Sequence, residues 1–76
     1  MSKGYASSFI EEVNASDKSK LGVRLGIICI KQGIPVTDVC EFFGVSRTAV
    51  YAWFLGKSSV SEKHSDKMEK LVQKLR

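Results

Sequence analysis

The chain has 76 residues, with 12 Lys and Arg against 8 Asp and Glu, and a formal net charge of +4. Its length predicts one small domain that buries only about 60% of the surface of the extended chain, and its basic balance favours a polyanionic partner without requiring one. The composition excludes a membrane-spanning helix, because no run approaches about 18 apolar residues, and the polar start of the chain predicts a cytoplasmic protein rather than a secreted one.

The first predicted element is a short helix over residues 5–14. Its apolar residues recur at the spacing of one helix face and are Tyr5, Phe9, Ile10 and Val13. Because so short a helix is marginal on its own, we expect it to pack on the rest of the domain. A dimer contact, or an arm that reaches DNA, is the alternative interpretation.

A longer helix is predicted over residues 17–32, with Ser16 or Asp17 as its N-cap. It carries two apolar stripes, formed by Leu21, Leu25 and Ile28 and by Val23, Ile27 and Ile30. A helix that is apolar on most of its surface must be covered on more than one side. We expect the N-terminal helix to supply this cover, with another subunit as the alternative. Gly22 and Gly26, four residues apart, would let a neighbouring helix approach closely.

Residues 36–56 predict two short helices joined by a tight turn. Apolar residues that can hold the pair together are Val39, Phe43, Val45, Val50 and Trp53. Gly44 lies where the chain turns, the Ser46 hydroxyl can cap the second helix, and Gly56 suits the end of that helix. Two helices joined by a glycine-containing turn of about three to four residues form the helix-turn-helix arrangement of DNA-binding proteins.

The second helix of this pair, residues 46–55, divides into two faces at about 100° per residue. The face expected to be buried consists of Ser46, Ala49, Val50, Trp53 and Phe54, and the opposite face consists of Arg47, Thr48, Tyr51, Ala52 and Leu55. No acidic residue occurs between Phe42 and Ser61. Arg47 can pair with a guanine, and Thr48 or Ala52 can touch a thymine methyl group, so this face is suited to the major groove. An ordinary amphipathic helix in a small bundle is the alternative interpretation.

These residues resemble the phage-repressor helix-turn-helix family, which contains lambda repressor and Cro-like proteins. The matching positions are the small residue Cys40, the turn Gly44-Val45-Ser46, the buried pair Val50 and Trp53, and the closing run Trp53-Phe54-Leu55-Gly56-Lys57. The resemblance covers about residues 21 to 57. It implies that Arg47, Thr48, Tyr51 and Ala52 enter the groove. Val36 stands where the family often has a glutamine that binds phosphate.

Two further residues are candidate phosphate contacts on either side of the reading helix. Thr37 lies near the start of the first helix of the pair, where exposed amides and a hydroxyl can hold a phosphate. The alternative is that Thr37 only caps that helix. Lys57 follows the end of the second helix, where a cation can contact the DNA backbone.

The last predicted helix covers residues 60–75. Ser59 and Glu62 form a capping box at its start. Its apolar stripe lies in the second half and consists of Met68, Leu71, Val72 and Leu75. This stripe is expected to cover either the domain's own core or a twin subunit.

No set of side chains predicts catalysis, a metal or a cofactor. Cys29, Cys40 and His64 do not have zinc-ligand spacing. We expect both cysteines to be free thiols that fill apolar space, with Cys40 buried between the two helices of the motif. His64 is expected to be a solvated surface residue. The protein is therefore predicted not to be an enzyme and to need no small-molecule ligand.

The expected fold is all-α, a single domain of about five helices over residues 1–76 that contains a helix-turn-helix. The expected function is sequence-specific binding of double-stranded DNA by a phage-type transcriptional regulator in a bacterial host cell, as a homodimer at least on DNA. One alternative is a protein-interaction module on the same fold, such as an antirepressor or polymerase inhibitor, which the apolar Tyr51, Ala52 and Leu55 favour. Another is DNA recognition in packaging or replication.

Overall fold

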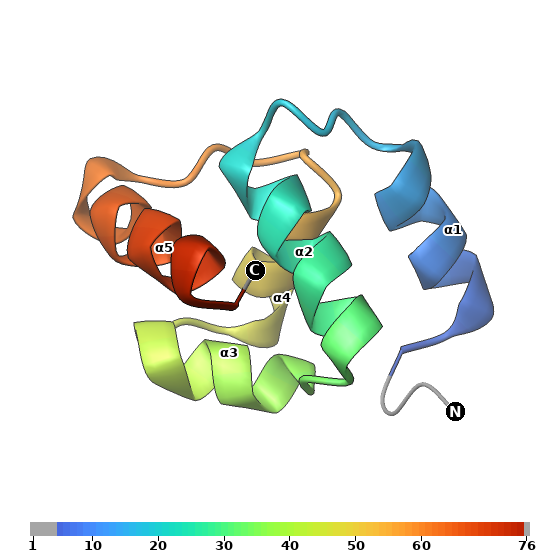
Figure 1. The fold of residues 1–76 in the computed structure, drawn as a ribbon, viewed down its shortest axis with the longest axis horizontal. Helices are drawn as coiled ribbons and strands as arrows, with labels where there is room; N and C mark the ends of the chain where they lie inside the picture. The colour runs from blue at the N-terminus through green and yellow to red at the C-terminus, as the bar shows by residue number, and fades with distance from the viewer. Residues whose placement is uncertain (1–4, 76) are drawn as a thin grey trace.

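The computed structural model describes residues 5–75. This part of the chain contains five helices and no strand: α1 Ser7–Ala15, α2 Leu21–Gln32, α3 Val36–Phe43, α4 Arg47–Phe54 and α5 Glu62–Leu75. The expected all-α bundle is confirmed. The helix α2 lies in the middle, with α1 on one side, α5 on the other, α3 along one end and α4 behind (Figure 1).

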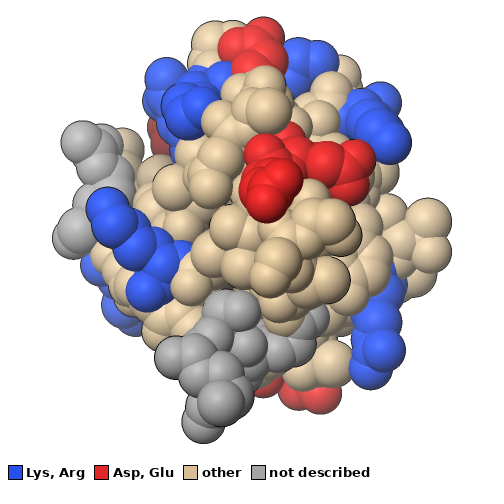
Figure 2. Space-filling model, turned by 90° about the vertical axis from the view of Figure 1, so that its right-hand side faces the viewer, with Lys and Arg blue, Asp and Glu red and all other residues tan. Residues whose placement is uncertain are grey.

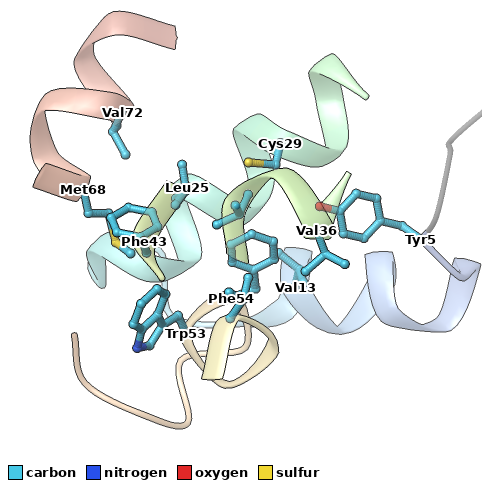
Figure 3. Close-up of a cluster of buried hydrophobic side chains, with 12 residues drawn as sticks. Tyr5, Val13, Leu25, Cys29, Val36, Phe43, Trp53, Phe54, Met68 and Val72 are labelled. Carbon is cyan, nitrogen blue, oxygen red and sulfur yellow. The ribbon is translucent and has the colours of Figure 1, made fainter. Parts of the chain in front are cut away.

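All five helices contribute side chains to one apolar core (Figure 3). Its largest fully buried members come from four helices and include Val13 of α1, Leu25 of α2, Phe54 of α4 and Met68 of α5. The helix α3 adds Val36, Val39 and Phe43. No polar or charged residue is buried within residues 5–75, so the hydrophobic effect supplies the main favourable contribution to folding.

The close approach of α2 and α4 depends on two glycines of α2. A Cβ atom on Gly22 would lie 2.6 Å from the backbone oxygen of Trp53, and one on Gly26 would lie 2.8 Å from Cγ of Phe54. A side chain at either position would therefore push α4 away from α2. The prediction that this glycine pair admits a neighbouring helix is confirmed, and the neighbour is α4.

The apolar stripe of α5 covers the core of its own domain. Met68 is fully buried and Val72 is 6% exposed, whereas Leu71 and Leu75 lie at the edge of the core and are only partly buried. On α2, Val23 is fully buried while Ile27 and Ile30 remain partly exposed. The second stripe of α2 is thus only partly covered.

Three helices begin later than the sequence suggests: α1 begins at Ser7 rather than at residue 5, and α2 and α5 also begin late. The predicted start of α2 at Asp17 is wrong, because the Asp17 carboxylate accepts hydrogen bonds from the Ser19 amide at 2.9 Å and the Ser19 hydroxyl at 2.6 Å. These bonds close a turn before the helix begins at Leu21. The predicted start of the last helix at residue 60 is also early. The carbonyl of Ser61, the residue just before α5, accepts a hydrogen bond from the Ser65 amide at 2.8 Å.

Candidate nucleic-acid interface

The turn between α3 and α4 is fixed by local hydrogen bonds. Gly44 ends α3 with a φ angle of 70°, and the amides of Gly44 and Val45 donate to the Cys40 carbonyl at 2.8 and 3.1 Å. A positive φ angle is strained for residues other than glycine, which explains the glycine here. The Ser46 hydroxyl accepts from the Ala49 amide at 3.3 Å. The prediction that Ser46 caps this helix is therefore confirmed.

The inward face of α4 is buried only from Val50 onward. Val50 and Phe54 are fully buried and Trp53 is 6% exposed. The Trp53 ring meets the Phe43 ring of α3 edge-on, with 5.5 Å between their centroids. Ser46 is exposed, and Ala49 is only partly buried. These contacts fix which side of α4 remains outside.

The outward face of α4 is free only in its first half. Arg47 and Thr48 are exposed, whereas Tyr51, Ala52 and Leu55 are partly buried. No ion pair within residues 5–75 involves Arg47. The guanidinium and hydroxyl groups at the start of α4 are thus available to a partner outside the protein. An exposed Arg has the donors for bidentate pairing with guanine.

The second half of this face is in contact with α1. The Phe9 ring meets the Tyr51 ring edge-on at a centroid distance of 5.1 Å. Beside this contact, Tyr5, Ala6 and Leu55 complete the lining of a hollow of about 290 Å³. This contact could not be predicted, because periodicity shows that α1 has an apolar face but not which helix that face meets.

The candidate phosphate contacts differ in their surroundings. The N-cap of α3 is Pro35, and no side chain caps the helix, so the interpretation of Thr37 as a cap is not supported. Thr37 is partly buried beside the exposed carboxylate of Asp38 in the same first turn. That carboxylate weakens the attraction of the helix start for phosphate. At the other end of the motif, Lys57 is exposed.

A second cation lies near the end of α4. The ammonium group of Lys20 donates to the Gly56 carbonyl at 3.0 Å, where a cation also interacts favourably with the helix dipole. Lys20 is 36 residues away from Gly56 in sequence, and a single sequence shows no sign of their contact. Lys20 is exposed and therefore joins Lys57 as a candidate backbone contact.

Two expectations about the chemically reactive residues are wrong. Cys40 is only partly buried, because Val36, Val39 and Phe43 form the inward face of α3 and Cys40 lies beside that face. His64 is not a solvated surface residue, since its ring lies 5.8 Å from the rings of both Phe43 and Trp53. The start of α5 passes over these aromatic rings, which the polar sequence of its first half does not indicate.

Within the described residues, no group of three or more His, Cys, Asp or Glu side chains is placed to hold a metal ion. Cys29 is fully buried, and burial raises the pKa of its thiol to about 11. No helix within residues 5–75 has the length and apolar character needed to cross a membrane. Of the chemistry that these residues carry, the exposed start of α4 is the clearest candidate for a binding surface.

The side of the molecule formed by α1 does not present a uniform charge. Acidic side chains lie near the middle of this side and basic ones toward its edges (Figure 2). Glu11 and Glu12 of α1 are both exposed. Carboxylates repel the phosphate backbone, so these residues disfavour the interpretation of α1 as an arm that reaches DNA.

Comparison of the chain with protein-family models, with curated proteins and with solved structures finds no match in any of the three.

Proposed function

We propose that the protein binds double-stranded DNA sequence-specifically with α4 in the major groove and acts as a small phage-type transcriptional regulator. The observation that carries this proposal is the exposed pair Arg47 and Thr48 at the start of a capped helix. The helix lies in a segment without acidic residues between Phe42 and Ser61. A regulator of this kind acts by occupying an operator and blocking polymerase.

The proposal gives separate roles to the two ends of α4. Arg47 pairs with a guanine, and Thr48 and Ala52 contact neighbouring bases. Lys57, together with Lys20, contacts the phosphate backbone beyond the end of the helix and contributes affinity without sequence preference. Tyr51 and Leu55 have a smaller part than the sequence implies, since they are partly buried beside α1.

The DNA-bound form is proposed to be a two-fold dimer. One reading helix covers only a few base pairs, and two reading helices about 34 Å apart, one turn of DNA, specify a longer site. The sequence offers two apolar stripes for such a dimer, but both are used inside the protomer. Met68 and Val72 of α5 are buried, as are Tyr5 and Val13 at the N-terminal end.

The test is selection of a binding site from a random duplex pool, followed by an electrophoretic shift assay over a range of salt concentrations. Each neutralised phosphate is expected to contribute about −0.9 to the slope of log K against log salt. A selected site that shifts with this salt dependence supports the proposal. A folded protein that shifts no duplex, or shifts all duplexes equally, overturns it.

A protein-interaction module is the second candidate. It is favoured by the apolar hollow that Tyr51 and Leu55 form with α1 on the outward face of α4. If the folded protein shifts no duplex but a Leu55→Lys substitution abolishes capture of a host protein, the interaction module replaces DNA binding as the proposed function.

A further inference from the structure

One face of α2 points away from α4 and carries a cation at each end. Gly22 and Gly26 lie against α4, because a Cβ atom at either position would overlap that helix. At about 100° per residue, Arg24 and Lys31 fall on the opposite side of α2, and both are exposed. In Figure 1, α2 lies in front of α4, so this face is turned toward the viewer.

Between the two cations the surface is apolar and hollowed. Ile27 and Ile28 are only partly buried there. A hollow of about 460 Å³ is lined by Lys18, Arg24, Ile27, Ile28 and, from α5, Val72. Val72 is 6% exposed, whereas the two cations of the lining are exposed, so the hollow has an apolar floor and a basic rim. We call Arg24, Ile27, Ile28 and Lys31 the outer face of α2.

The cations at this face keep their charge. The Lys18 ammonium group donates to the Asn14 carbonyl, and Nε of Arg24 donates to the Lys18 carbonyl at 2.9 Å. Each bond uses one of several donors and ends on an uncharged oxygen, so it positions the cation without neutralising it. No ion pair within residues 5–75 involves Lys18, Arg24 or Lys31.

The acids near this face do not cancel its charge. Asp17 precedes Lys18, but its carboxylate accepts from the Ser19 amide and hydroxyl. Glu69 is exposed three residues before Val72 on α5, and it does not line the hollow. The outer face of α2 is therefore a basic surface with an apolar centre, and charge complementarity selects an acidic partner.

The spacing of the two cations narrows the kind of acidic partner. Arg24 and Lys31 are seven residues apart, which is about 10.5 Å along the helix, so one small anion cannot contact both. The outside of a DNA duplex offers phosphates but no apolar surface to cover the isoleucines. Two side chains seven residues apart on a second helix have the same spacing and share a face. Apolar side chains between them can enter the hollow, as when an amphipathic helix binds in a groove.

We propose that the outer face of α2 binds an acidic amphipathic helix of a partner protein. Carboxylates of that helix pair with Arg24 and Lys31, and apolar side chains between the carboxylates contact Ile27 and Ile28. Because this face is opposite α4, a duplex on α4 and a partner helix on α2 can be bound at the same time. The proposal goes beyond DNA binding and does not depend on it.

Three synthetic helical peptides test the proposal. They share a leucine-lined face and differ only in the residue that flanks it, which is Glu, Gln or Lys. Fluorescence anisotropy measures the binding of each peptide to the full chain. The Glu peptide should bind roughly tenfold more tightly than the Gln peptide, through two exposed ion pairs, and the Lys peptide should bind least. Absence of binding by the Glu peptide, or equal binding of all three, overturns the proposal.

Charge reversal locates the binding surface. The double variant Arg24→Glu and Lys31→Glu should reverse the order of the peptides, so that the Lys peptide binds most tightly. The matched control is Lys63→Glu with Lys70→Glu, which changes the net charge equally at two exposed positions on the side of α5 opposite Val72. This control should still prefer the Glu peptide. A preference for the Glu peptide that survives in the first double variant overturns the proposed surface.

A single variant guards against an effect on folding. Lys31→Glu breaks no hydrogen bond within residues 5–75, and it should weaken the Glu peptide roughly threefold while the circular dichroism spectrum is retained. A folded Lys31→Glu variant with unchanged affinity for the Glu peptide also overturns the proposal.

Other occupants of this face and the proposed DNA surface are tested separately. Vesicles that contain phosphatidylglycerol and a random DNA duplex are the alternative probes. If the Arg24→Glu and Lys31→Glu double variant loses binding to either probe while the Glu peptide never binds, a lipid or DNA contact replaces the partner helix. Arg47→Ala should leave peptide binding unchanged, whether or not the protein binds DNA. A loss of peptide binding in Arg47→Ala would place the peptide on α4 and overturn the proposal.

Discussion

The two cysteines differ in burial, and this difference predicts their reactivity. Cys29 is fully buried with a thiol pKa raised to about 11, whereas Cys40 is partly exposed. The thiolate is the reactive form, and the raised pKa keeps the Cys29 thiol protonated at pH about 8. We expect a thiol reagent to modify Cys40 much faster than Cys29 in the native protein. Mass spectrometry of the modified peptides, with Cys40→Ala as control, measures both rates. Equal rates would contradict the burial of Cys29.

Tyr5 predicts a loss of stability at alkaline pH. Its hydroxyl donates to the Ile34 carbonyl at 2.8 Å, and burial, followed by the neighbouring Cys29, raises its pKa above the usual 10.0. A raised pKa means that the fold favours the neutral phenol. This contribution is complete below pH 10.0 and is lost as the pH rises toward the folded-state pKa.

The comparison of Tyr5→Phe with the unmodified protein isolates this effect. At neutral pH the substitution should lower the free energy of unfolding by roughly 0.5–1.5 kcal/mol through the lost hydrogen bond. Above pH about 10 the difference should shrink, since the variant has no phenol to ionise. Urea unfolding of both proteins in a Cys29→Ala background removes the thiol, whose raised pKa acts in the same direction. A difference that is constant with pH would show that Tyr5 ionises freely in the fold.

Arg47→Ala and Lys57→Ala are predicted to weaken DNA binding in different ways. Arg47→Ala should weaken binding to the selected duplex by about 1–3 kcal/mol. It should also relax the sequence preference of the protein, because the contact between Arg47 and a base is lost. Lys57→Ala should weaken binding to selected and random duplexes by the same factor and reduce the salt slope by about 1. Electrophoretic shift assays on the selected and random duplexes measure, for each variant, the ratio of its dissociation constant to that of the unmodified protein. An equal loss on both duplexes for Arg47→Ala would exclude base reading by Arg47.

At the scale of helices, the contact between α2 and α4 is the least tolerant of added volume. Gly22→Ala and Gly26→Ala should each lower the free energy of unfolding by about 1–3 kcal/mol, although Ala is the better helix former. Gly22→Ala should be the more severe, since its Cβ would meet the Trp53 backbone oxygen, whereas the Phe54 ring near Gly26 can shift. Thermal and urea unfolding measure both changes. Stabilisation by either substitution would show that the helices are farther apart.

The helices themselves were predictable because their apolar spacing is repeated and their caps are local. The Gly44 turn, the Ser46 cap and the buried face of α4 follow from residues within one or two turns of one another. The start of α2 was not predictable, because the Asp17 side chain serves a turn rather than a helix start. Ser16 and Asp17 are both residue types that commonly cap a helix. The residue type alone does not show whether the side chain caps a helix or closes a turn.

The exposure of the candidate site was predictable at the N-terminal end of α4 but not at its C-terminal end. Arg47 and Thr48 are exposed as the two-faced pattern of α4 indicates, but Tyr51 is in contact with Phe9 of a distant helix. The surroundings of His64 likewise depend on how α5 crosses the rings of Phe43 and Trp53. Such contacts are set by the packing of whole helices, which no local pattern contains.

For the whole molecule, the single core predicts cooperative unfolding. Trp53 contacts Phe43 of α3 and His64 of α5, so its fluorescence reports the packing of three helices. Circular dichroism reports all of the helices. In urea the two signals should follow one transition, as expected for a small domain. A change in one signal at lower urea concentration than the other would show that α1 or α5 unfolds separately. If α1 is that helix, Phe9→Ala should increase the difference between the two midpoints.

Because Phe9 packs against Tyr51, α1 covers part of the α4 surface on which the DNA duplex is proposed to bind. A base pair that reaches Tyr51 must first displace Phe9. Binding along the whole of α4 therefore selects the conformations in which α1 has moved away. The observed affinity is then lower than the intrinsic affinity by the fraction of molecules in that state. The helix α1 has nine residues and no side-chain cap at its start, so its local opening needs less free energy than global unfolding. Faster hydrogen exchange of the α1 amides on addition of the selected duplex would reveal this displacement, and unchanged exchange would confine the duplex to the Arg47 end of α4.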